Sequence, residues 1–158
     1  MLSEPEGVDF GALPPKIDAL LQQGVVAYRH DREEADRLFQ EALTLAPQEL
    51  ASYYCLYKIH CYMGSLELAA TFAEAGLREA TRQLGWPTDP NQWPPNISAG
   101  AGSARFALFT LKALTFIQLK RGDAEAARKG LRALATIDPA NSVGWSVIDE
   151  LFQGVERG

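Results

Sequence analysis

The sequence predicts an all-α fold built from paired helices, and three observations support this prediction. Apolar and small residues recur at helical spacing from Leu20 to Pro47. The same spacing returns near the C-terminus and ends at Pro139. In both places an aromatic residue, Tyr53 or Trp145, follows the proline by six positions. With 158 residues, of which 47% are hydrophobic, the chain is long enough to bury a core.

Composition excludes several classes of protein. The apolar fraction is too high for an intrinsically disordered chain. No apolar run approaches the roughly 18–20 residues that a membrane-spanning helix needs. Residues 1–15 carry acids and contain no apolar stretch of the signal-peptide type, so we expect a cytoplasmic protein. Twenty acidic residues against 15 basic ones give a net charge of −5, which argues against a nucleic-acid or anionic-membrane partner.

The first helix pair is expected over residues 16–47. Small residues occur on both helices, at Gly24, Ala27, Ala35 and Ala42. Small residues three and four positions apart on one face allow a second helix to approach closely. Phe39 is the large apolar residue between them, and Pro47 ends the pair because proline cannot continue a helix.

Two further helix pairs follow the same pattern, over residues 48–81 and 104–139. The matching residues of the second pair are Tyr53, Leu56, Gly64 and Ala69. The matching residues of the third pair are Leu111, Leu114, Gly122, Ala127, Leu131, Leu134 and Pro139. Three occurrences of one pattern in a chain of this length indicate an internal repeat.

This pattern resembles the tetratricopeptide repeat (TPR), a helix–turn–helix unit of about 34 residues. The resemblance implies a right-handed α-solenoid of three helix pairs, forming one domain over residues 16–153 after an N-terminal extension over 1–15. A further helix over 142–153 would cap the last repeat, as such stacks require. The chain departs from the family pattern at Tyr57, where a small residue is usual, and at Thr81, where a proline is usual.

An insertion over residues 82–103 separates the second and third pairs. Its prolines disfavour an α-helix and favour extended or turn conformations. A long ordered loop inside a compact domain is often functional, so Trp86 and Trp93 are candidate site residues that would form a lid or extra wall. The favoured interpretation is structural, with both rings buried to hold the loop against the body of the domain.

The resemblance also implies a concave groove lined by the first helix of each repeat. The groove candidates are Tyr28, Arg29, Tyr54, Lys58, Tyr62, Phe109, Lys112, Phe116 and Lys120. Aromatic and cationic side chains together suit a peptide or helix that carries apolar and acidic groups. No groove position holds the asparagine with which chaperone-binding relatives clamp a C-terminal carboxylate, so that specificity is not expected. The alternative role of these residues is ordinary packing between repeats.

Cys55, His60 and Cys61 suggest a metal site, but residues five and six apart on one helix point in different directions. A role in the core is favoured. The acidic residues of segment 33–41 have the spacing of a solvated helix face. No phosphate-binding glycine loop, nucleophile elbow or zinc-protease motif occurs. We therefore predict no catalytic residues, no cofactor and no metal.

The sequence thus predicts a non-catalytic interaction module or adaptor that binds a segment of another protein. Segments 83–86 and 105–122 also resemble small bacterial TPR proteins encoded among nitrogen-fixation genes, which implies a nitrogenase component or assembly factor as the partner. Two alternatives stay open: a secretion-type chaperone for a client protein and, less favoured, a metal-binding protein. The apolar terminal helix also allows a weak homodimer, although capping alone is favoured.

Overall fold

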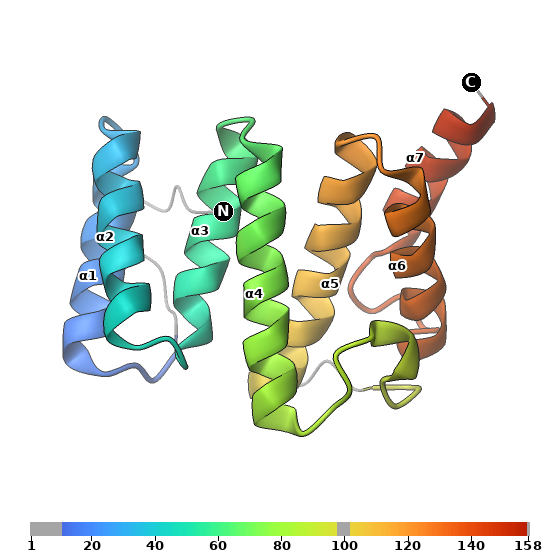
Figure 1. Cartoon of the computed structure of the whole chain (residues 1–158), viewed down its shortest axis with the longest axis horizontal. Helices are drawn as coiled ribbons and strands as arrows, with labels where there is room; N and C mark the ends of the chain where they lie inside the picture. Colours follow the sequence, from blue (N-terminus) through green and yellow to red (C-terminus); the bar gives the residue numbers. More distant parts are fainter. Residues whose placement is uncertain (1–10, 98–101, 158) are drawn as a thin grey trace. The chain divides into compact units, whose positions relative to one another are not determined.

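The computed structural model describes residues 11–97 and 102–157, and within them the chain is all-helical, with no strand (Figure 1). The α-helices are α1 (Pro15–Ala27), α2 (Arg32–Leu45), α3 (Leu50–Tyr62), α4 (Leu66–Leu84), α5 (Gly102–Lys120), α6 (Ala124–Ile137) and α7 (Ser146–Arg157), and a 3-10 helix η1 spans Pro90–Gln92. The predicted all-α class is confirmed. None of the described helices combines the length and the apolar character needed to cross a membrane.

The chain divides into two compact units, residues 1–72 and 73–158. The first unit contains α1, α2, α3 and the beginning of α4. The second unit contains the rest of α4, together with η1, α5, α6 and α7. Each unit therefore contains a helix pair from the sequence pattern, α1 with α2 and α5 with α6, and both pairs pack closely.

In the first unit, the α1–α2 pair depends on a glycine. A Cβ atom at Gly24 would overlap the ring of Phe39, which is fully buried between the helices. Only glycine allows the ring to come this close to the helix backbone. Asp31 begins α2 as its N-cap, because its carboxylate accepts a hydrogen bond of 3.1 Å from the backbone N–H of Glu34.

The α5–α6 pair of the second unit is built in the same way. A Cβ atom at Gly130 would overlap the side chain of Thr115, which is buried on the facing helix. Asp123 is the N-cap of α6 and accepts a hydrogen bond of 3.1 Å from the backbone N–H of Ala126. The two units thus share a glycine at the helix contact and an aspartate at the start of the second helix.

The non-helical part of the insertion is shorter than the sequence predicted, because α4 continues to Leu84 and α5 begins at Gly102. Residues 98–101 lie outside the described part of the chain. Residues 90–92 form the single 3-10 turn η1, which packs against α6. Proline at the first position of this turn is tolerated because no helical hydrogen bond needs its missing N–H.

The insertion also caps the C-terminal end of α6. The last carbonyls of an α-helix have no partner within the helix. Here the backbone N–H of Asn96 donates to Thr136 O (3.4 Å) and that of Ile97 donates to Ile137 O (2.8 Å). The insertion is therefore a structural part of the second unit.

The terminal helix α7 spans Ser146–Arg157, so the predicted bounds of 142–153 were wrong by four residues at each end. A turn whose hydrogen bonds centre on Asp138 lies between the end of α6 and the start of α7. The buried Asp138 carboxylate accepts hydrogen bonds from the backbone N–H of Ser142 (2.9 Å) and of Val143 (3.0 Å), and from the Ser142 hydroxyl. These bonds keep the chain out of the helical conformation until residue 146.

Inner residues of α7 attach it to the second unit. Ile148 and Phe152 are buried in a cluster with Ala127 and Leu131 of α6, and Phe116 of α5 packs against the same cluster. Helix α7 thus packs against α6 and α5.

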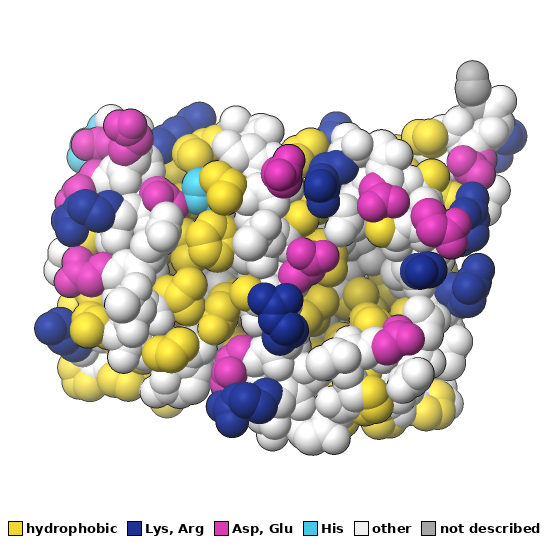
Figure 2. All heavy atoms as spheres, in the orientation of Figure 1, with side chains coloured by type: hydrophobic (Ala, Val, Ile, Leu, Met, Phe, Trp, Pro, Cys, Tyr) yellow, Lys and Arg dark blue, Asp and Glu magenta, His cyan; other side chains and the backbone are white. Residues whose placement is uncertain are grey.

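Charged side chains of both signs occur together on one face of the molecule. On the face shown in Figure 2, acidic and basic groups are interspersed, with apolar side chains visible between them. On this face, the described residues form no large patch of basic side chains of the kind that attracts nucleic acid.

Candidate functional site

Three of the predicted groove residues form one stripe along α3, and Tyr28 joins them at the end of α1. Tyr54, Lys58 and Tyr62 are four positions apart and therefore share one helix face. The Lys58 Nζ lies 5.5 Å from the centre of the Tyr54 ring and 5.9 Å from that of Tyr62. The rings of Tyr28 and Tyr62 are 6.3 Å apart. We call these four residues the α3 cluster.

The α3 cluster is only partly covered by the protein. Tyr62 has 43% of its surface exposed, and the other members are half-buried. Burial raises the pKa of Tyr54 and of Tyr62, and a neighbouring tyrosine adds to the shift in each case. The two hydroxyls therefore stay neutral and can donate a hydrogen bond to a partner.

A second stripe lies along α5 in the other unit. Phe109, Lys112, Phe116 and Lys120 are separated by three or four positions and share one face. The Lys120 Nζ lies 5.9 Å from the centre of the Phe116 ring. Phe109, Lys112 and Phe116 are half-buried, and Lys120 is exposed. We call these four residues the α5 stripe.

Two lysines of the α5 stripe are available to an acidic partner. Among the described residues, no carboxylate lies within 4.0 Å of the ammonium group of Lys112 or Lys120. A carboxylate brought beside them would gain an ion pair while its neighbours covered the adjacent rings.

Two arginines extend these groups, and the sequence analysis missed both. The Arg32 guanidinium lies 5.3 Å from the centre of the Tyr28 ring, and that of Arg105 lies 4.7 Å from the centre of the Phe109 ring. Each arginine is four positions from its aromatic partner. Arg105 and Phe109 both lie on α5, where this spacing places two side chains on one helix face and could have identified the contact. Tyr28 follows α1 and Arg32 begins α2, so their contact crosses a turn and is not predicted by spacing along one helix.

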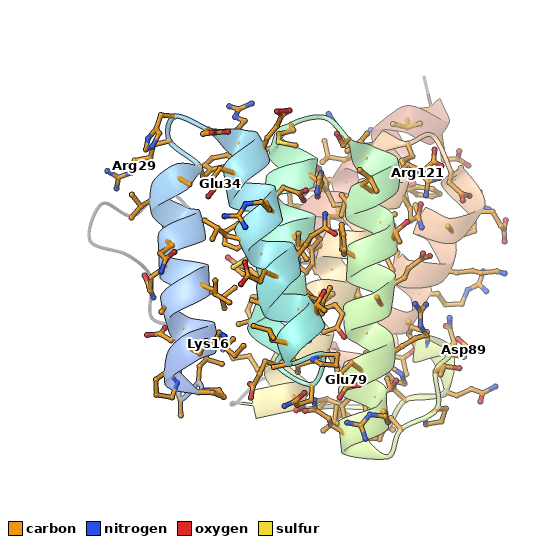
Figure 3. The ribbon with its side chains drawn as sticks, turned by 60° about the vertical axis from the view of Figure 1, so that its left-hand side comes forward. Lys16, Arg29, Glu34, Glu79, Asp89 and Arg121 are labelled. Carbon is orange, nitrogen blue, oxygen red and sulfur yellow. The ribbon has the colours of Figure 1, made fainter. Side chains whose placement is uncertain are left out.

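Arg29 is placed differently from the rest of the predicted site. It lies in the turn that follows α1 and is exposed. Its side chain extends away from the α1–α2 pair (Figure 3).

Trp86 and Trp93 have a packing role. Trp93 is only 4% exposed, and its indole N–H donates to the carbonyl of Pro87 (2.8 Å). The half-buried Trp86 ring packs against it, with the ring centres 5.2 Å apart. These contacts support the structural interpretation of the insertion.

Two of the three candidate metal ligands of α3, Cys55 and His60, are buried, and Cys61 is partly exposed. Burial raises the pKa of the Cys55 thiol well above its ordinary value, which disfavours the thiolate that binds metals. The buried His60 ring stacks on Phe72, and its Nε2 lies 2.7 Å from Oδ1 of Asp36. In the part of the chain that the structure describes, no group of three or more His, Cys, Asp or Glu residues is arranged to hold a metal ion.

The interpretation of segment 33–41 as a uniformly solvated face was wrong at Asp36. This carboxylate turns toward α3 and pairs with His60, 24 positions along the chain. The spacing of residues along one helix does not reveal a contact with a different helix. Asp36 therefore could not be separated from its exposed neighbours by sequence alone.

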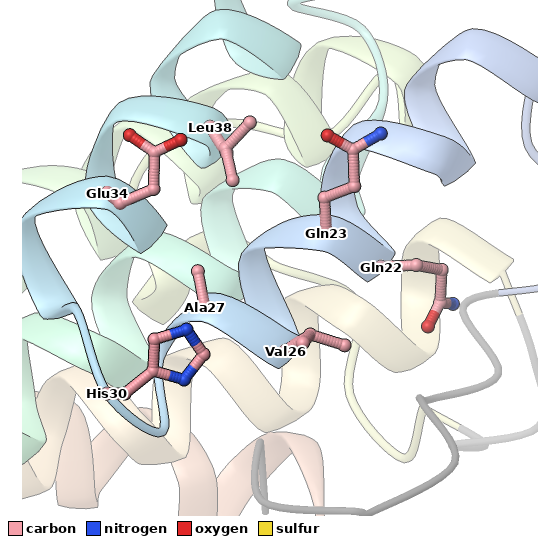
Figure 4. Close-up of a pocket in the computed structure, with 7 residues that line it drawn as sticks. All are labelled: Gln22, Gln23, Val26, Ala27, His30, Glu34 and Leu38. Atoms are coloured by element: carbon pink, nitrogen blue, oxygen red, sulfur yellow. The ribbon is translucent and has the colours of Figure 1, made fainter.

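A hollow of about 440 Å³ opens at the surface of the α1–α2 pair (Figure 4). Its lining residues are Gln22, Gln23, Val26, Ala27, His30, Glu34 and Leu38. The carboxylate of Glu34 already accepts two hydrogen bonds from Arg37, at 2.7 and 2.8 Å, and this hydrogen bonding lowers the pKa of Glu34. Glu34, the one acid among the lining residues, is thus already paired with Arg37. The sequence analysis gave no indication of the hollow.

Comparison of the chain with models of protein families, with curated proteins and with solved structures finds no match. The TPR resemblance therefore depends on the residue pattern itself. The helix pairs and the two surface groups described above are the basis for a functional proposal.

Proposed function

We propose that this protein is a non-catalytic, TPR-like interaction module that binds a segment of another protein. The observation that supports this most directly is the pairing of half-exposed aromatic rings with lysines on α3 and again on α5. Partly exposed rings gain by being covered, since burial of apolar surface contributes roughly 25 cal/mol per Å². The right-handed solenoid of three helix pairs belongs to the same proposal.

The chemistry of the two faces indicates the kind of segment that would bind. Aromatic rings accept apolar side chains, and the adjacent ammonium groups favour carboxylates between them. The local charge agrees, because residues 103–158 carry 8 basic and 6 acidic side chains in a chain whose net charge is −5. We therefore expect a partner segment in which apolar and acidic residues alternate.

A pull-down from the native cell extract tests this function. The variant Lys58→Glu/Lys112→Glu reverses one cation on each face. The control Lys16→Glu/Lys129→Glu changes the net charge equally at exposed positions outside both groups. We expect one protein to be retained by the wild type and the control and lost by the variant, with all three chains equally helical by circular dichroism.

The captured protein is identified by mass spectrometry and its binding is then measured with the purified components. A nitrogenase component would support the weaker resemblance to proteins of nitrogen fixation. Equal capture by the variant and the wild type would contradict the assignment of the α3 cluster and the α5 stripe as the binding faces.

A further inference from the structure

Helix α7 has an apolar face that the described residues leave largely exposed. Its inner residues Ile148 and Phe152 are buried against the second unit. On the adjacent, outward side of the helix, Val147, Leu151 and Val155 are 59%, 47% and 61% exposed. These three residues are four positions apart, so they form one continuous stripe. A stripe of large apolar side chains exposed in this way is typical of a surface that contacts another protein.

Gly154 lies beside this stripe, and no facing helix in the described part of the chain fills the place of its missing side chain. A glycine inside a helix costs roughly 1 kcal/mol relative to alanine. At Gly24 and Gly130 the chain uses the missing Cβ, because a side chain of the facing helix occupies its place. At Gly154 no atom of another element, within residues 11–97 and 102–157, lies within 4 Å of the position that a Cβ would take. The open space next to an apolar stripe is where a side chain from another molecule could approach the α7 backbone.

Charged residues at the edge of the stripe indicate that the molecule contacting α7 is a second copy of this chain. Glu150 and Arg157 are both exposed and lie two helical turns apart along the same edge of α7. Neither has an ion-pair partner among the described residues. When two α7 helices lie antiparallel, the Glu150 edge of one runs beside the Arg157 edge of the other. The face is therefore complementary to itself.

We propose that two copies of this chain associate through α7, with the two helices antiparallel about a two-fold axis. Leu151 of each copy packs on Gly154 of the other, Val147 and Val155 flank this contact, and Glu150 pairs with Arg157 across the interface. A two-fold contact uses the same patch twice, which is what a self-complementary face provides. The dimer is independent of the proposed peptide-binding function, because it uses none of the residues of the α3 cluster or the α5 stripe.

The area available on one helix pair sets the strength of this contact. Stable interfaces bury roughly 1,200–2,000 Å² in total, and one pair of short helices supplies less than that. The dimer is therefore weak, and the population of dimer depends on the protein concentration.

Sedimentation equilibrium of the full chain tests the proposal, at concentrations up to several hundred micromolar. The mean mass of the wild type should rise from that of the 17.3 kDa monomer toward twice that value. Leu151→Glu should raise the dissociation constant at least tenfold, because it places a carboxylate in the centre of the contact. A wild-type chain that stays monomeric throughout would overturn the proposal.

Gly154→Ala separates a role in association from a role in folding. Because the Cβ meets open space in the monomer, alanine should raise the melting temperature of a dilute sample by about 2–4 °C. The same methyl group should raise the dissociation constant several-fold, because it displaces Leu151 of the other copy. A dimer of unchanged affinity would show that the contact lies elsewhere.

A charge exchange tests the antiparallel register. Glu150→Arg places two arginines opposite each other at both ends of the contact and should weaken the dimer. The double variant Glu150→Arg/Arg157→Glu restores opposite charges and should return the dissociation constant to within about threefold of the wild-type value. Failure of the second change to restore association would rule out this register.

Discussion

Single glycines determine how closely the helices pack in this protein. The ring of Phe39 lies where the Cβ of any other residue at position 24 would be, and Thr115 does the same at position 130. The small residue at position 24 was predicted from spacing alone, whereas Gly130 was not singled out. The structure supplies the reason, since each missing side chain is replaced by one from the facing helix.

Gly24→Ala is therefore expected to destabilise the first unit by about 1–3 kcal/mol, because the new methyl group displaces the buried ring. This loss outweighs the gain in helix propensity from alanine. Urea denaturation measures the change in the free energy of unfolding. The double variant Gly24→Ala/Phe39→Leu is the control, and it should recover part of the loss; an unchanged stability of the single variant would contradict the close contact.

Asp138 should make the stability of the second unit depend on pH. Burial alone would raise the pKa of this carboxyl, but hydrogen bonds from the Ser142 hydroxyl and from the backbone N–H groups of Val143 and Ser142 outweigh burial and lower it. A lowered pKa in the folded state contributes stability above the unfolded value, near pH 4, and this stability is lost as the pH falls through the folded value.

The variant Asp138→Asn should cost about 1–2 kcal/mol at pH 7, because it loses charge-assisted hydrogen bonds. The difference from the wild type should shrink below about pH 4, where the wild-type carboxyl also takes up a proton. Thermal unfolding at a series of pH values provides the comparison. A difference that is constant from pH 7 to pH 3 would show that ionisation of Asp138 does not contribute.

At the scale of elements, the insertion between α4 and α5 is a packed segment. It buries Trp93 and supplies donors to the last carbonyls of α6. Its prolines and tryptophans indicated an ordered segment without an α-helix, and the structure contains such a segment between residues 85 and 97, with the short 3-10 helix η1 within it. The helix end on which it packs could not be predicted, because that contact joins Asn96 to a carbonyl on a later helix.

Trp93→Ala should destabilise the second unit by about 3–5 kcal/mol through loss of a buried ring. Trp86→Ala is the matched control, and it should cost less because Trp86 is only half-buried. Amide hydrogen exchange locates the effect, which should include faster exchange of Ile97, the donor to the α6 carbonyl of Ile137. Equal losses for the two variants would contradict the anchoring role of Trp93.

At the scale of the whole molecule, the sequence predicted what depends on periodicity and missed what depends on contacts between helices. The all-α class follows from spacing along single helices, and so do the shared faces of Tyr54, Lys58 and Tyr62 on α3 and of the α5 stripe, once the TPR resemblance has selected these residues. The pair of Asp36 and His60 does not, because its members lie on different helices. The start of α7 was misplaced for a similar reason, since hydrogen bonds to Asp138 delay the helix until Ser146.

The cap that the insertion places on α6 has a consequence for the order of folding. Helix pairs of this kind form from contacts that are local in sequence, which favours rapid folding. The bond from the Asn91 side chain to the Lys129 carbonyl instead joins residues 38 positions apart. Such a contact requires closure of a long loop, so we expect it to form after the more local contacts between α5 and α6. The insertion should therefore pack onto α6 after the folding transition state. Its contacts should slow unfolding of the second unit and leave the rate of folding almost unchanged.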